Sequence, residues 1–220
     1  MARILVATRP DHDTLTEYIA SWIQPLIELA NKQVDTVVFD LSGKDASREA
    51  FEKIVTETKP NIILLNGHGN KEVVAGFADE VLIKCGENAD LTRGSIVHAF
   101  ACDSAARLGP ECVSVGAEAY IGYKEKYWLG HLGYSKGRQC DDPIAKLYLE
   151  PAIEVVKALI EGASVNEAYR RSQRMYADNI LRMLASVNTD YNSVIASQLS
   201  HNFMHQAALG NLDTSIPLAS

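Results

Sequence analysis

The most constraining feature of this chain is a repeated alternation of short apolar runs with segments of helical periodicity. Apolar runs at residues 3–8 and 35–41 precede segments 14–30 and 46–57, in which apolar residues recur at helical spacing. A third run, 61–65, is apolar without interruption, which is typical of a strand that helices cover on both faces. This alternation predicts a parallel sheet whose strands are joined by right-handed helical connections.

The pattern continues beyond residue 65 with weaker signals. Two more apolar runs, 95–101 and 119–123, are predicted as the fourth and fifth strands. Residues 73–75 and 81–84 are predicted to form a short hairpin, and a short helix is expected within 105–116.

The C-terminal third differs because its helical segments are almost free of Gly and Pro. A Gly- and polar-rich loop at 129–141 leads into helical segments at 143–162 and 164–208, and Pro151 is predicted to divide the first of these. We therefore predict an α/β fold, a mostly parallel sheet flanked by helices with a helical C-terminal third. It is expected to form one domain over residues 1–220.

Charge and cysteine content narrow the function classes. The net charge is −7 at pH 7, whereas nucleic-acid-binding proteins usually carry a basic face, so no nucleic-acid partner is expected. The apolar run at 4–7 is too short for a secretory signal, and no uncharged stretch is long enough to span a bilayer. We therefore expect a cytoplasmic protein without a membrane partner. The four cysteines form no Cys-x-x-Cys pair, so they are expected to be reduced thiols.

Two chemically competent side chains follow consecutive long apolar strands of the predicted sheet, and they can meet if those two strands are neighbours. His68 lies in Asn66-Gly67-His68-Gly69-Asn70, after the third strand, and Cys102 lies in Ala101-Cys102-Asp103-Ser104, after the fourth. The carboxyl ends of parallel strands meet at one edge, so the two residues can meet there. An imidazole can draw the proton from a thiol, and a functional pair predicts that Cys102 reacts at a lower pH than an ordinary thiol. The N–H groups of Gly69 and Cys102 are the candidate oxyanion donors.

The order of these residues, histidine before cysteine, resembles that of the caspase-like (clan CD) cysteine peptidases. The resemblance covers residues 60–125 best and is closest to the CHAT and gingipain branches, in which a Cys-x-(Ser/Thr)-Ala stretch leads to a Gly-Ala pair and a strand ending in Ile-Gly. The matching residues here are Cys102 to Ala105, Gly116-Ala117 and Ala119 to Tyr123, and, more loosely, residues 201–210 with Asp213. It implies an endopeptidase with His68 as base or acid, Cys102 as nucleophile, and Gly69 and Cys102 N–H groups as the oxyanion hole. Hydrolysis would pass through a thioester acyl-enzyme.

The sequence departs from the caspases themselves, because Phe100 and Asp103 replace the glutamine and the basic residue that flank the Ala-Cys pair there. A preference for aspartate before the cleaved bond is therefore not expected. In the family, the loops after the first and fifth strands form the primary pocket, and here residues 9–13 and 123–128 occupy these places. Arg9 would suit an acidic substrate side chain, and Asp11, Asp13 or Glu125 a basic one.

We predict a basic preference, with Asp11, Tyr123 and Glu125 binding the substrate. The expected partners are a protein or peptide substrate and an activating partner.

The other histidines and cysteines are not part of the predicted pair. His98 lies within the fourth predicted strand and is expected to be a buried histidine with satisfied hydrogen bonds. His131, His201 and His205 are alternative bases. His201 and His205 have the spacing of a helical metal pair but no third ligand, so no metal site is predicted. Cys85, Cys112 and Cys140 lack the context of a strand end and are expected to be structural.

Two other function classes stay open. The chain could be a catalytically silent binding module of the same fold, or a flavodoxin-like ligand-binding domain unrelated to peptidases. No Gly-x-Gly-x-x-Gly follows the first strand, so no dinucleotide is expected, and no cofactor is predicted.

Overall fold

The centre of the protein is a six-stranded sheet in the order β2-β1-β3-β6-β7-β8, in a computed structural model that describes residues 2–186 and 189–216. Its strands are β1 (Arg3–Arg9), β2 (Thr36–Ser42), β3 (Ile62–Asn66), β6 (Ile96–Phe100), β7 (Ala119–Tyr123) and β8 (Gln206–Gly210). Neighbouring strands are parallel except β8, which runs antiparallel to β7. The predicted α/β fold class is confirmed.

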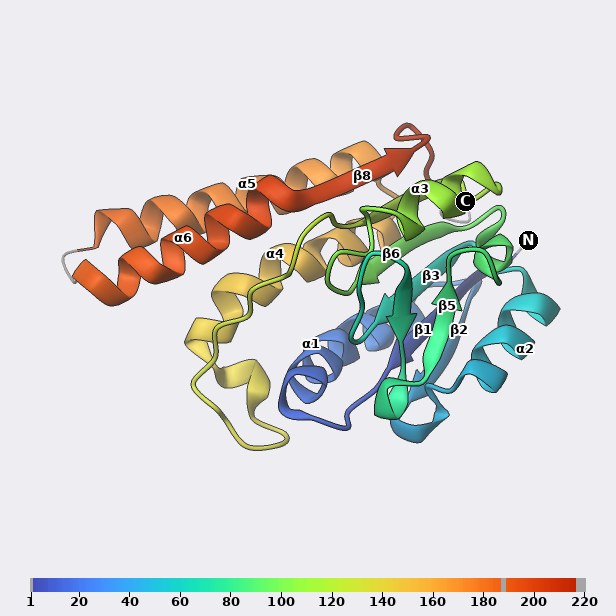
Figure 1. Cartoon of the computed structure of the whole chain (residues 1–220), viewed down its shortest axis with the longest axis horizontal. Coiled ribbons are helices and arrows are strands. Elements are labelled where there is room, and N and C mark those ends of the chain that lie inside the picture. Colours follow the sequence, from blue (N-terminus) through green and yellow to red (C-terminus); the bar gives the residue numbers. More distant parts are fainter. Residues whose placement is uncertain (1, 187–188, 217–220) are drawn as a thin grey trace.

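Helices cover both faces of this sheet (Figure 1). They are α1 (Thr14–Asn31), α2 (Arg48–Thr58), α3 (Leu108–Ser114), α4 (Pro143–Ile160), α5 (Val165–Ala185) and α6 (Thr189–His205), with single 3-10 turns at η1 (Gly43–Asp45), η2 (Phe77–Asp79), η3 (Ala89–Thr92) and η4 (Gln139–Asp141). Successive strand residues point to opposite faces, so Leu5 and Ala7 of β1 pack in the core under α1, α4 and α5. Val6 packs in the core under α2, α3 and the hairpin of β4 (Val73–Ala75) and β5 (Val81–Lys84).

Helix α4 is continuous through Pro151, so the predicted division at this residue is wrong. A proline lacks the N–H that would bond to the carbonyl four residues earlier, which here belongs to Leu147. The side-chain amide of Asn179 in α5 donates to that carbonyl at 2.9 Å. The neighbouring helix thus satisfies the group that the proline leaves free.

The predicted helical segment 164–208 contains two helices and a strand. Helices α5 and α6 lie side by side and extend beyond the sheet (Figure 1). The chain then passes from His205 directly into β8, where Gln206 pairs with Tyr123 and Gly210 pairs with Ala119. A short apolar run such as 206–210 is compatible with either a helix or a strand. Here it forms a strand because it pairs with the otherwise unpaired edge of β7. Of the helices within 2–186 and 189–216, none combines the length and the apolar character needed to cross a membrane.

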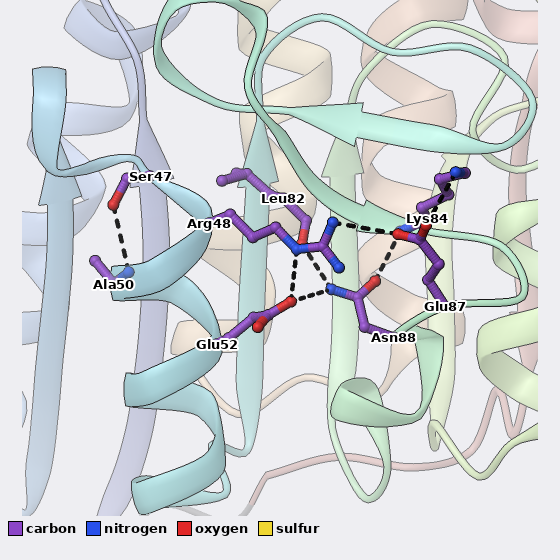
Figure 2. A network of polar contacts seen from close by, with 8 residues as sticks. All are labelled: Ser47, Arg48, Ala50, Glu52, Leu82, Lys84, Glu87 and Asn88. Atoms are coloured by element: carbon purple, nitrogen blue, oxygen red, sulfur yellow. Dashed lines mark hydrogen bonds and ion pairs between the residues drawn. The ribbon is translucent and has the colours of Figure 1, made fainter.

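A polar network attaches the β4–β5 hairpin to helix α2 (Figure 2). Its centre is Asn88, whose side-chain amide donates to Glu52 at 2.8 Å and to the carbonyl of Leu82 at 2.9 Å. The Asn88 side-chain oxygen accepts from the N–H of Lys84 at 2.9 Å, and Arg48 donates to Glu52 at 2.7 Å. The hairpin follows the segment that carries His68, so this network helps to hold that segment in place.

His98 is buried in β6, as predicted, but neither ring nitrogen hydrogen-bonds to another of the described residues. The expectation of satisfied hydrogen bonds is therefore wrong. Burial favours the uncharged imidazole and lowers the pKa of His98 to about 4.

This histidine makes the stability of the fold sensitive to acid. The folded protein resists protonation of His98 until about pH 4, whereas the unfolded chain takes up the proton near pH 6.5. Stability should therefore fall as the pH drops from about 6.5 to about 4, by roughly 2 kcal/mol at pH 5. We expect His98→Leu to remove this part of the pH dependence, measured as free energies of unfolding in urea at pH 7.5 and pH 5.

The control is Ile96→Val, a volume change on the same strand. It should lower stability equally at both pH values. An identical pH dependence in His98→Leu and the wild type would contradict the prediction.

Candidate active site

The structure brings His68 and Cys102 to the same edge of the sheet. Strands β3 and β6 are adjacent, with Asn66 paired to Phe100, and the two candidate residues follow these strand ends. Both side chains line one small cavity of ≈ 50 Å³. The cavity is mostly apolar, and its other lining residues come from α1, the two strand ends and the segment after β7: Leu15, Thr16, Ile19, Gly67, Phe100, Ala101, Tyr127 and Leu129. The parallel topology thus places the pair as the sequence predicted.

The thiol of Cys102 is half-buried and held by the segment after β7. Its Sγ accepts the N–H of Tyr127 at 3.4 Å. Burial raises the pKa of Cys102, which the Tyr127 N–H only partly counteracts. This direction is opposite to the lowered pKa that a preformed thiolate would have. Among the hydrogen bonds of the described residues there is none between Cys102 and His68, so the thiol is uncharged in this state.

His68 is oriented by Asp13, the residue that caps helix α1. The His68 Nε2 lies 2.6 Å from Asp13 Oδ2, while Asp13 Oδ1 accepts the N–H of Thr16 at 2.9 Å. Burial alone would raise the pKa of Asp13, but the Thr16 N–H and the imidazole outweigh it and lower the pKa overall. The carboxylate therefore stays charged and fixes the Nε2 side of the ring, so Nδ1 is the nitrogen left to exchange a proton.

Sequence reasoning considered Asp13 only as a possible pocket charge and missed its position beside His68. A signal for this position was present in the strand order. Asp13 follows the first strand, and β1 is the other neighbour of β3, so its carboxyl end also lies at this edge.

The glycines around His68 allow close approach between the two candidate loops. A β-carbon on Gly69 would lie 2.9 Å from Ala101 Cβ and 3.3 Å from the Cys102 carbonyl oxygen. Gly69 forms an isolated antiparallel bridge with Val74, flanked by the bond from Ala75 N–H to the His68 carbonyl. In such a ladder the bridged pair between two bonds does not exchange hydrogen bonds. The N–H of Gly69 thus points away from β4.

The three predicted substrate-binding residues do not come together. The carboxylate of Asp11 pairs with Lys136 Nζ at 3.0 Å and lines a larger hollow of ≈ 410 Å³. The Tyr123 side chain is buried, and its hydroxyl lies 2.9 Å from that of Tyr176. Glu125 is exposed, and its carbonyl accepts the Asp103 N–H at 3.3 Å. None of the residues that line the larger hollow also lines the cavity at Cys102.

The remaining polar candidates have other partners. Arg9 pairs with Asp40 at 2.6 Å, so its charge is already neutralised. Burial raises the pKa of Cys85 to about 11 and that of Cys112 to about 12. Both thiols are therefore uncharged at neutral pH, and the thiolate is the reactive form.

The comparison with solved structures gives only a distant structural likeness. No protein-family model matches the chain, and no curated protein sequence matches it. Among solved structures, the chain is similar to an inactive zymogen C11 protease from Parabacteroides distasonis, with a TM-score of 0.39 and 11% sequence identity. The matched region covers 72% of this chain and 63% of that one, less than two thirds of its length. The resemblance to the CHAT and gingipain branches stays a prediction.

Proposed function

We propose that the protein is a cysteine endopeptidase in which Cys102 is the nucleophile and His68 exchanges the proton. The observation that carries this proposal is the placement of both side chains around one cavity, at the carboxyl ends of adjacent parallel strands. Asp13 supports it further, since a carboxylate at Nε2 stabilises the imidazolium that forms during acyl transfer.

The reaction uses each of these groups in turn. The Nδ1 of His68 takes the proton of Cys102 as the sulfur attacks the substrate carbonyl carbon. The N–H groups of Gly69 and Cys102 stabilise the oxyanion. When the peptide C–N bond breaks, His68 returns the proton to the leaving amine and a thioester remains. A water molecule, deprotonated by His68, then hydrolyses the thioester and restores the thiol.

The uncharged, Tyr127-bonded thiol points to a resting state. We propose that occupation of the cavity by substrate or by an activating partner moves the segment after β7, releases Cys102 from the Tyr127 N–H and brings it to His68. A catalytically silent binding module is the second candidate, favoured by the raised pKa of Cys102.

A preference for a basic residue before the cleaved bond remains part of the proposal. Asp11 is the candidate for the pocket charge; its carboxylate already pairs with Lys136 Nζ at 3.0 Å, so a basic substrate side chain would displace this ammonium group. Glu125 adds a second exposed carboxylate at the end of β7.

The test is labelling of the purified protein with peptidyl chloromethyl ketones, varied at the residue next to the ketone, in reducing buffer near neutral pH. We expect the peptide portion to accelerate alkylation of Cys102 relative to plain chloroacetamide. Exposed Cys140 is the internal control, because its rates report the intrinsic difference in reactivity between the two reagents. Equal acceleration at both cysteines, or none at Cys102, would reject the peptidase and favour the silent module.

A further inference from the structure

A second chemical feature adjoins His68 of the candidate dyad. His12, Asp13 and His68 each offer one ligand atom, and these three atoms lie within 4.8 Å of one another. His12 precedes α1, whereas Asp79 reaches the same point from η2, where its Oδ1 lies 3.5 Å from His12 Nε2. Two imidazoles and one carboxylate therefore lie together, and a second carboxylate, that of Asp79, is in reach of His12.

The imidazole of His12 is shielded from solvent without a hydrogen-bonding partner. Both of its ring nitrogens are buried, and neither hydrogen-bonds to a described residue. Its Nε2 lies 3.6 Å from Asp13 Oδ2 and 3.5 Å from Asp79 Oδ1, longer than a good hydrogen bond. The ring of Phe77 contacts it edge-on, with centroids 5.5 Å apart. An imidazole whose two nitrogens are shielded from solvent and that lies between two carboxylates is placed as a metal ligand would be.

These distances suit a divalent transition ion. Ligands about 2.1 Å from a tetrahedral zinc ion lie roughly 3.4 Å from each other, close to both separations around His12. Two changes are needed: the short contact between His68 Nε2 and Asp13 Oδ2 must open, and the exposed Asp79 side chain, which contacts His12 but lies outside the group of three, must turn toward the ion. Asp13 Oδ1 already caps α1, so Oδ2 is the atom free to bind. The two carboxylates also balance the charge of the ion.

We propose that His12, Asp13, His68 and Asp79 bind a zinc-like divalent cation that switches off the dyad. A neutral imidazole that binds a metal through Nε2 carries its proton on Nδ1. His68 then cannot accept the proton of Cys102, and Asp13 is no longer available to stabilise an imidazolium. Binding of the ion depends only on these four side chains, whereas its inhibitory effect rests on the proposed function.

Titration of the metal-free full chain with Zn²⁺, followed by calorimetry, tests the site without any need for peptidase activity. We expect one ion per chain, and a loss of affinity in His12→Gln larger than the roughly tenfold effect of losing an outer partner of a metal ligand. Asp79→Asn should weaken binding in the same direction. The controls His201→Gln, from the other histidine pair, and Cys102→Ala should bind as the wild type does.

Equal affinity in His12→Gln and the wild type would overturn the site. A loss of affinity in Cys102→Ala would also overturn it, since the ion would then be held by the thiolate.

Peptide hydrolysis and labelling of Cys102 separate the two proposals. We expect Zn²⁺ to inhibit the wild type and to leave His12→Gln active at the same concentration, and equal inhibition of both would overturn the inhibitory role. If His12-dependent binding is found but peptidyl chloromethyl ketones do not alkylate Cys102 in preference to Cys140, the metal site stands and the peptidase fails.

Discussion

The Cys102→Ala variant is expected to lose peptide hydrolysis by more than about 10³-fold in kcat/KM, because no other thiol can replace it. Cys85 and Cys112 are held uncharged by burial, and Cys140 lies in a different hollow. Alanine keeps the β-carbon of Cys102, so the sheet edge should fold unchanged. Initial rates on the best peptide of a library, measured alongside thermal unfolding, check both parts.

Two further variants test whether the loss of hydrolysis is specific to the His68–Cys102 pair. His68→Ala should reduce hydrolysis to a similar level, because nucleophile and base act as a unit, whereas Cys85→Ala should retain the activity of the wild type. Residual hydrolysis of equal size in Cys102→Ala and the wild type would show that the cleavage comes from elsewhere, and the role of Cys102 would be rejected.

The parallel strands and their order along the chain could be predicted because they depend on the local pattern of apolar residues. Unbroken apolar runs such as 61–65 can be stable only between two covering layers, and alternation with helices implies parallel strands. The parallel direction of the strands alone predicts that His68 and Cys102, which both follow strand ends, lie at the same edge of the sheet. The failures at Pro151 and at β8 have a different cause. In both, a distant partner, the Asn179 amide or the open edge of β7, decides the conformation.

The finer chemistry of the site depends on loops, whose conformation is set by contacts far apart in sequence. The N–H of Tyr127 reaches Cys102 Sγ, and Asp13 reaches His68 across 55 positions. His12 carries no motif that marks it in the sequence, and only the turn at Asp79 gives it a second carboxylate. Residue types at strand ends thus predict which groups meet, but not their hydrogen bonds or the direction of the pKa shift at Cys102.

The segment that carries His68 depends on Gly67, and Gly67→Ala is expected to be among the most destabilising single changes in the protein. Gly67 has a φ of +148°, and a β-carbon there would lie 2.1 Å from the carbonyl oxygen of Ala75. Strain and overlap with backbone together should cost on the order of 3 kcal/mol of unfolding free energy. Part of this cost could be relieved only by moving the β4–β5 hairpin away, which would displace His68 and reduce hydrolysis.

Gly94→Ala separates backbone strain from atomic overlap. Gly94 also has a positive φ, +77°, but no atom lies within 4 Å of its added β-carbon. It should therefore cost only the strain of a left-handed residue, about 1–2 kcal/mol. Urea unfolding of both variants measures the difference. If Gly67→Ala is no less stable than Gly94→Ala, the close approach of Gly67 to Ala75 does not hold the His68 segment, and the geometry derived for the dyad would need revision.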